Sequence, residues 1–201
     1  MSTNGPVKRR RGAVAREEAL EAARDLLLSG GPAAVTLKAV GERMGVGHAN
    51  LIHHFGSAAG LQGALMDAMV RDLAERIEAG LNEGSGEGRE GVEPDRLMTV
   101  VFDAFGKGGA SQMAAWLALA REQGPAESFG GVVRDLADRL AAMAPDDPRA
   151  AERARSLVMT AAYMAFAEGL IGDILTPMLG APEGLGRELA LKLTATVLAE
   201  P

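Results

Sequence analysis

The sequence predicts an all-α protein of about nine helices, with a small amino-terminal helix-turn-helix domain of three helices and a larger carboxyl-terminal helical domain. Alanine, leucine, methionine and charged helix formers dominate the 201 residues, and alternating runs of β-branched residues are missing. Charge also divides the chain, because residues 1–56 carry eight Lys and Arg against five Asp and Glu, whereas the whole chain has a net charge of −6. We therefore predict a disordered basic arm over 1–12, a helix-turn-helix domain over 13–56 and a helical domain over 57–201.

The predicted arm contains the basic run Lys8, Arg9, Arg10 and Arg11. A short charged run on its own is usually a solubilising tail. Beside a helix-turn-helix it is also placed to neutralise phosphates or to enter a minor groove, so these four residues are candidates for DNA binding. The first helix is predicted over 13–29, because its leucines and alanines form one apolar stripe before a Gly-Gly-Pro break.

The stretch 36–61 reads TLKAVGERMGVGHANLIHHFGSAAGL and predicts two short helices joined by a glycine turn. Thr36 is placed to cap the first helix, and Gly45 can adopt the positive φ that ends it. Leu51 and Phe55 continue the apolar stripe in the second helix. A turn this short sets the two helices at a steep angle, which is typical of a helix-turn-helix whose second helix projects toward DNA.

The projecting helix, predicted over about 48–55, contains all three histidines of the chain. His48, His53 and His54 are spaced five and one apart, which does not place two of them on one helical face, so the spacing does not favour a metal site. A pH-sensitive surface is conceivable because histidine titrates near neutrality, but contact with DNA is the simpler interpretation. On the preceding helix, Lys38 and Arg43 are candidates for phosphate contact.

The second domain is predicted as a series of helices separated by Gly-rich and Pro-rich breaks. Their ranges are 57–81, 95–106, 110–123, 127–144, 148–175 and 183–199. The stretch 83–94 is rich in Gly and charge and predicts a loop. The segment 157–174 is apolar around most of its circumference. With the last helix it is a candidate homodimer interface, and an ordinary core helix explains the same pattern equally well.

Bulky apolar side chains on the central helices of this domain predict an adaptable cavity for a small hydrophobic or planar molecule. For each residue taken alone, core packing is the competing interpretation. The candidates are Phe102, Phe105, Met113, Trp116, Leu117, Met143, Met159, Tyr163, Met164 and Phe166, and the polar groups that could orient a ligand are Tyr163, Gln112, Arg121 and Glu168.

Enzymatic chemistry is not expected. The chain has no cysteine, and no histidine lies in the second domain, so the usual nucleophile and general-base constellations cannot be assembled there. We expect no metal and no cofactor. The longest apolar run, 157–167, is too short to cross a bilayer, and the amino end lacks the apolar segment of a secretory signal. These features predict a soluble, cytoplasmic protein without a membrane partner.

The residues resemble the tetracycline-repressor (TetR) family of one-component transcriptional regulators. The resemblance covers about residues 14–70: a helix, then TLKAVGERMGV, then a short helix that ends in HF, then a leucine at the start of a long helix. It implies a homodimeric repressor with a DNA-binding domain over 13–56 and a ligand-binding and dimerisation domain over 57–201. It also implies a palindromic double-stranded operator, with half-sites roughly 34 Å apart or somewhat more, which the repressor leaves when a small-molecule effector binds.

Matching the family position by position implies a role in DNA binding for several residues. Thr36 and His54 match phosphate contacts, Asn50 matches a contact to base or backbone, and His48, Ala49 and His53 match base contacts. Gly47 replaces the usual serine cap, which removes a side-chain acceptor from the second helix.

Two further departures remove DNA contacts, since Ile52 replaces the usual tyrosine and Ala58 the usual lysine. They predict weaker phosphate binding, for which the basic arm compensates, while Ile52 can cover a thymine methyl group. The alternative function is a dimeric protein of the same fold that has lost DNA binding and sequesters a ligand or partner.

Overall fold

A computed structural model of the chain describes residues 5–84, 94–120 and 125–199. These residues form nine α-helices and one short 3-10 helix with no strand among them, which confirms the all-α prediction. The elements are α1 (Gly5–Gly30), η1 (Pro32–Ala34), α2 (Leu37–Met44), α3 (His48–Phe55), α4 (Ala58–Gly84), α5 (Pro94–Phe105), α6 (Ala110–Ala120), α7 (Pro125–Ala142), α8 (Ala150–Met178) and α9 (Leu185–Ala199).

The largest difference from the predicted bounds lies at the amino end. α1 begins at Gly5, so residues 5–12, predicted as part of a disordered arm, continue the first helix. Lys and Arg are good helix formers and a proline in the first turn costs no hydrogen bond, so the segment can continue the helix although Gly12 is a poor helix former. Residues 1–4 and the side chains of Lys8, Arg9, Arg10 and Arg11 lie outside the described part of the chain.

The other bounds differ from the predicted ones by less than a turn. α8 continues to Met178, past the break expected before Pro177, because a proline in the last turn removes only one backbone bond. α4 continues to Gly84 and α5 begins at Pro94, so the predicted loop over 83–94 falls mostly on residues 85–93, which lie outside the described residues.

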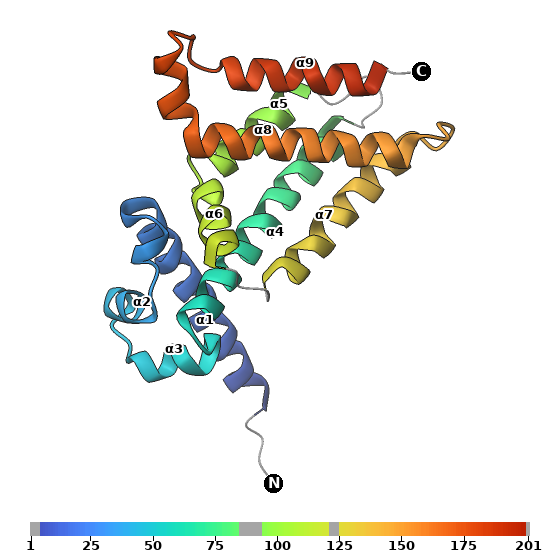
Figure 1. Cartoon of the computed structure of the whole chain (residues 1–201). Coiled ribbons are helices and arrows are strands. Elements are labelled where there is room, and N and C mark those ends of the chain that lie inside the picture. The colour runs from blue at the N-terminus through green and yellow to red at the C-terminus, as the bar shows by residue number, and fades with distance from the viewer. Residues whose placement is uncertain (1–4, 85–93, 121–124, 200–201) are drawn as a thin grey trace.

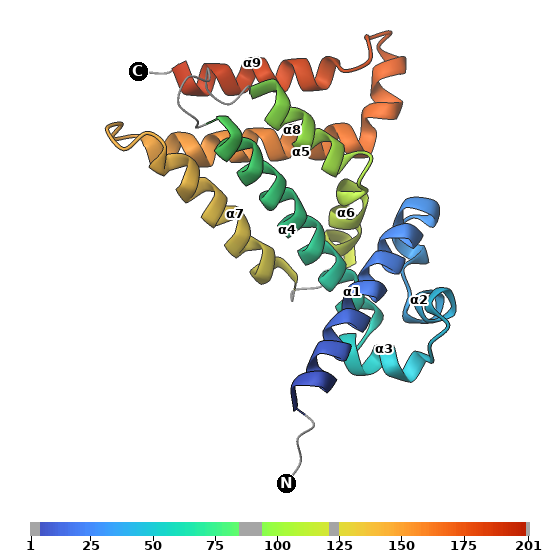
Figure 2. The ribbon, with the colours of Figure 1, turned by 180° about the vertical axis from the view of Figure 1, so that it is seen from behind.

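α1, α2 and α3 form a unit at one end of the molecule, and α4 leads from this unit into the second domain (Figure 1). α4 packs there against α5, α6 and α7. α8 and α9 run side by side along the opposite edge, as both views show (Figure 2). The DNA-reading end that the sequence predicts is therefore far from α9, and α4 and α6 are the helices that connect the two ends.

One hydrophobic core joins the amino-terminal unit to the second domain. It includes Leu27 of α1, Val40 of α2, Leu51 of α3 and Leu65 of α4, together with Met113 of α6. Each of these side chains is at most 1% exposed, and burying one stabilises the fold by about 1.5–3 kcal/mol. Since α6 contributes to the same core as α1–α3, a movement of α6 would change the packing beneath the helix-turn-helix.

The turn between α2 and α3 has the geometry that the sequence predicts. The Ala39 amide donates to Thr36 Oγ1 over 3.1 Å, which caps α2. Gly45 ends the helix in the left-handed conformation, with φ 67° and ψ 27°. A Cβ atom on Gly41 would lie 2.9 Å from the Val46 carbonyl oxygen, so the close approach of the chain after the turn requires a glycine at this position.

α8 presents an unusual apolar surface. Among the residues that the structure describes, it is the one helix long and apolar enough to cross a membrane by length and composition. The prediction counted only the uninterrupted run 157–167, whereas the apolar pattern continues past Glu168 to Ile174 and makes the longer stretch. Only 11% of the most apolar 18-residue window is buried, so the other described residues leave most of this stretch of α8 at least partly uncovered.

Candidate DNA-binding surface and the adjoining pocket

α3 is held by two buried side chains and exposes the opposite face. Leu51 is 1% exposed and Phe55 is 8% exposed, and both belong to the core that α1, α2 and α4 share. The residues that the sequence predicts as DNA contacts lie on the outer face: His48, Ala49, Asn50, Ile52 and His53 are exposed, and His54 is half-buried. The structure therefore brings the predicted α3 residues together on one free surface.

The amino end of α3 lacks a side-chain cap, as the sequence predicts. Gly47 is the N-cap residue, and no side chain accepts a hydrogen bond from the first turn. Ala58, at the position of the family's usual lysine, is exposed at the start of α4, close in sequence to the end of α3. A basic residue could therefore stand at this position without loss of core packing.

The two basic candidates on α2 each have an acidic neighbour. Arg43 Nη2 lies 2.9 Å from Asp25 Oδ2 on α1, and Lys38 Nζ lies 3.8 Å from Glu42 Oε1 one turn further along α2. These side chains are exposed, and exposed ion pairs contribute only about 0–1 kcal/mol, so a DNA phosphate can displace the acid. Both residues remain candidates for phosphate contact, although the neighbouring carboxylates offset part of their attraction for a phosphate.

Arg16 is a further cation near α3 that the sequence reasoning did not single out. Its guanidinium carbon lies 5.4 Å from the centre of the Phe55 ring. This cation–π contact joins the middle of α1 to the end of α3. Its contact with Phe55 could not be predicted from the sequence, because it depends on how α1 packs against α3.

A hydrogen-bonded chain links α6 to the segment that precedes α2. Trp116 Nε1 donates to Gln62 Oε1 on α4 over 3.1 Å, and Gln62 Nε2 donates to the Val35 carbonyl oxygen over 3.0 Å. Gln62 is 8% exposed and Val35 is fully buried, next to the α2 cap Thr36. The second domain is thus bonded through one buried side chain to the start of the helix-turn-helix.

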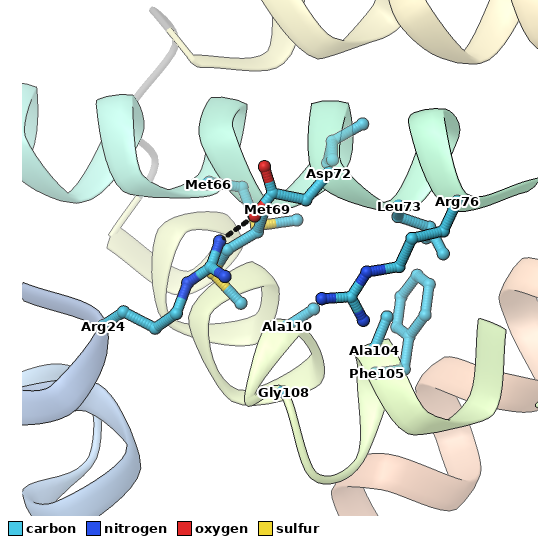
Figure 3. Close-up of a pocket in the computed structure, with 11 residues that line it drawn as sticks. Arg24, Met66, Met69, Asp72, Leu73, Arg76, Ala104, Phe105, Gly108 and Ala110 are labelled. Carbon is cyan, nitrogen blue, oxygen red and sulfur yellow. Dashed lines mark hydrogen bonds and ion pairs between the residues drawn. The ribbon is translucent and has the colours of Figure 1, made fainter. Parts of the chain in front are cut away.

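A pocket of about 70 Å³ lies where α1, α4, α5 and α6 meet (Figure 3). Its walls are mostly apolar, and Met66, Met69 and Phe105 supply the largest side chains. Arg24 of α1 forms an ion pair with Asp72 of α4 at its edge. The full lining is Arg24, Met66, Met69, Val70, Asp72, Leu73, Arg76, Ala104, Phe105, Gly108 and Ala110.

Phe105 is the one predicted ligand-binding residue that lines this pocket. Met113 and Leu117 belong to the shared core, and Trp116 is bonded to Gln62. Other candidates point elsewhere: Met143, Met159 and Tyr163 are exposed, and Phe102, Met164 and Phe166 are half-buried outside this pocket. Of the predicted polar groups, Gln112 is exposed, Glu168 is half-buried and Arg121 lies outside the described residues.

The pocket was not found from the sequence because α1, α4 and the α5–α6 connection contribute to it together. Bulky apolar side chains on the central helices can be recognised in the sequence. Which of them border the pocket depends on how four elements pack together. For the metal question, no group of three or more His, Asp or Glu side chains suited to holding an ion occurs among the described residues.

Residues 19–65 match the model of a family described as bacterial regulatory proteins, tetR family. The match includes all of α2 and α3 and parts of α1 and α4. The resemblance predicted from the sequence is thus confirmed over this part of the chain. The family consists of regulatory proteins, which agrees with the expectation that the chain is not an enzyme.

Two solved structures share the fold over most of the chain. A transcriptional regulator from Rhodococcus sp. Rha1 is 20% identical, with a TM-score of 0.60 over 90% of this chain and 96% of that one. The multidrug binding protein EbrR, in complex with imidazole, is 17% identical, with a TM-score of 0.59 over 92% of this chain and 96% of that one. No curated protein matches the chain. The chain thus has the fold of these two proteins, and the family match over residues 19–65 supports a DNA-binding regulator.

Proposed function

We propose that this protein is a homodimeric transcriptional repressor that binds a palindromic operator and leaves it when a small, largely apolar effector binds. The observation that carries the proposal is the outer face of α3. His48, Asn50 and His53 are exposed there while Leu51 and Phe55 hold the helix in the core. A helix anchored and exposed in this way, within a helix-turn-helix, is suited to the major groove.

The same face explains how specificity would arise with few charges. Asn and His side chains can bond base edges, and Ile52, which is 44% exposed, can cover a thymine methyl group. Phosphate attraction would come from Thr36, Lys38, Arg43 and His54, and from the basic residues at the start of α1. Since α1 is helical from Gly5, that basic run would approach DNA as the end of a helix rather than as a loose arm.

The pocket between α1, α4, α5 and α6 is the candidate effector site. It has apolar walls, and it borders both the family-matched segment and the second domain. An effector shifts the equilibrium only if it binds one conformation better than the other. A ligand seated between α1 and α5 would favour a conformation in which these helices stand further apart, and α1 would carry the helix-turn-helix with it.

Dimerisation would use the outer face of α8 and α9. Large apolar side chains are exposed along both helices: Met159, Tyr163, Leu170, Ile171, Ile174, Leu175, Met178, Leu189 and Leu193. A second copy of the chain is the natural occupant, because two-fold pairing covers the same surface on both subunits and presents two α3 helices to a palindrome. The predicted cytoplasmic location accords with this role.

The test is a salt-dependent mobility shift with the DNA upstream of the protein's own coding region. Replacing His53 and Asn50 with alanine should reduce specific binding by about tenfold or more, because each good base contact contributes about 1–3 kcal/mol. Leu119→Ala is a matched surface control on α6, where Leu119 is 85% exposed. Equal binding of operator and random DNA by the unmodified protein would exclude the proposed repressor.

A second function has some support from the structure. Ile52 and Ala58 lack the family's usual phosphate-binding groups, and Arg43 and Lys38 each lie beside an acid. A protein of this fold that had lost DNA binding would sequester a ligand or partner instead. The mobility shift separates the two functions, because the sequestering protein would show neither operator binding nor a salt-dependent affinity.

A further inference from the structure

The pocket has more positive than negative charge at its edge. Arg24 and Arg76 both line it, and Asp72 is the acidic residue beside them. Figure 3 shows the Arg24 guanidinium beside Asp72 and the Arg76 guanidinium between Ala110 and Phe105. Arg24 is paired with Asp72, whereas no ion pair of Arg76 occurs within the described part of the chain. Arg76 is an exposed residue that lines the pocket, so its charge is accessible to a ligand.

We propose that the pocket binds a small organic acid, whose apolar body lies against Met66, Met69 and Phe105 and whose carboxylate pairs with Arg76 and competes with Asp72 for Arg24. As the site of effector action, this rests on the function proposed above and replaces a purely apolar effector with an amphipathic anion. A guanidinium presents a planar fork of donors that matches a carboxylate, which makes two arginines a recognition element for this group.

The size of the pocket limits the body of the ligand. About 70 Å³ is roughly half the volume of an engineered cavity that binds benzene, so the pocket holds a short chain or one edge of a ring, and the flexible methionines can adapt to either. A neutral ligand of the same shape would gain the apolar contacts but leave Arg76 without a partner. The site should therefore discriminate by charge more than by shape.

The ion pair gives the anion a direct effect on the helix-turn-helix. Arg24 belongs to α1 and lies within the family-matched segment, while Asp72 lies on α4 beyond it. A carboxylate that takes Arg24 from Asp72 replaces a contact between the two domains with a contact to the ligand. Binding of the acid and loss of this interdomain ion pair are then one event, which biases the position of α1 relative to α4.

The experiment uses benzoate and its neutral counterpart benzamide, titrated into the full chain with ¹³C-labelled methionine methyl groups. Met66 and Met69 report on the pocket, and Met178, which is 76% exposed on α8, is the internal control. We expect benzoate to shift the first two resonances and not the third. Benzoate should bind a few-fold more tightly than benzamide, because an ion pair with an exposed arginine contributes about 0–1 kcal/mol.

Two variants locate the charge. Arg76→Gln should weaken benzoate binding a few-fold and leave benzamide binding unchanged. Asp72→Asn should strengthen benzoate several-fold because it frees Arg24, and a gain of affinity cannot come from misfolding. Equal affinities for the two probes, unchanged benzoate binding by Arg76→Gln, or no shift at Met66 and Met69 would overturn the proposal.

A ligand-free mobility shift on the same samples keeps the two proposals apart. If the protein binds operator but the pocket does not discriminate benzoate from benzamide, the organic-acid proposal is wrong and the repressor proposal stands. Charge discrimination without operator binding would lead to the reverse conclusion, and the site would then belong to a protein that sequesters an acid.

Discussion

Ala58 is the residue at which the chain departs from its family with the least structural consequence. It is exposed at the first position of α4, beyond the buried anchor Phe55. Ala58→Lys should therefore add a phosphate contact without disturbing the core. We expect tighter operator binding and a plot of log affinity against log salt that is steeper by about 0.9.

Fluorescence anisotropy with labelled operator at several salt concentrations measures both quantities. Ala142→Lys is the matched control, because Ala142 is exposed at the end of α7 and gains the same charge. If the two variants change the slope equally, the effect comes from the net charge of the protein, and position 58 does not face the DNA phosphates.

Thr36 fixes the start of α2 through its side chain. Its Oγ1 accepts from the Ala39 amide over 3.1 Å, and such a cap stabilises a helix by about 1 kcal/mol. Thr36→Ala should lower the melting temperature by roughly 2–4 °C in a protein of this size, whereas Thr36→Ser keeps the acceptor and should change it little. Circular dichroism during heating measures the shift, and equal melting temperatures for the two variants would contradict the capping role.

At the scale of elements, Gln62 is the buried side chain that α4 places between α6 and the segment before α2. Gln62→Leu would leave the buried Val35 carbonyl without this donor, at a cost of about 1–3 kcal/mol. Trp116→Phe removes only the indole donor to Gln62. If the two bonds act as one chain, the double variant should be less destabilised than the sum of the single ones, by about 1 kcal/mol.

Chemical unfolding followed by circular dichroism gives the four free energies of this cycle. The same variants should also reduce the change in DNA affinity that the effector causes, because the hydrogen bonds that link α6 through Gln62 to the segment before α2 are lost. A strictly additive cycle would show that Trp116 and Gln62 stabilise the fold independently.

Local patterns predicted the elements that local forces determine. α3 was predicted over 48–55 and spans His48–Phe55, because a short helix between two glycines leaves one way to bury Leu51 and Phe55. Its exposed face followed from the same periodicity, so the α3 part of the site was predictable. The prediction of a disordered arm is wrong over residues 5–12, where α1 is already helical. The charge of this run suggested an arm, whereas the helix propensity of its Lys and Arg residues favours a helix.

Contacts between distant elements were not predictable from the same patterns. The bond from Trp116 to Gln62 spans 54 positions, and the Arg43–Asp25 pair depends on how α2 packs on α1. The pocket draws on four elements, and Phe105 alone among the predicted ligand-binding residues lines it. A single sequence shows which residues are polar or apolar, but not which of them contact one another in the fold.

At the scale of the whole molecule, the exposed apolar face of α8 and α9 is the surface that the proposed second subunit would cover. Ile174 is 62% exposed and Leu193 is 48% exposed, on helices that lie side by side at the edge opposite α3. An apolar surface of this extent marks either a protein partner or a membrane. The carboxylates Glu168 and Asp173 interrupt the apolar stretch of α8, which favours a protein partner with a polar rim.

Ile174→Asp should therefore convert a dimer into a monomer, because a charge buried at a two-fold interface meets its own copy or lies close to it. Light scattering coupled to size-exclusion chromatography measures the mass, and Leu119→Asp on α6 is the matched control that should remain dimeric. The monomer should retain its helical content but bind the operator far more weakly, since the second half-site no longer benefits from the effective concentration that a dimer provides. A dimer that survives Ile174→Asp and also survives Leu193→Asp would place the interface elsewhere, and binding of the unmodified chain to lipid vesicles would assign the face of α8 to a membrane instead.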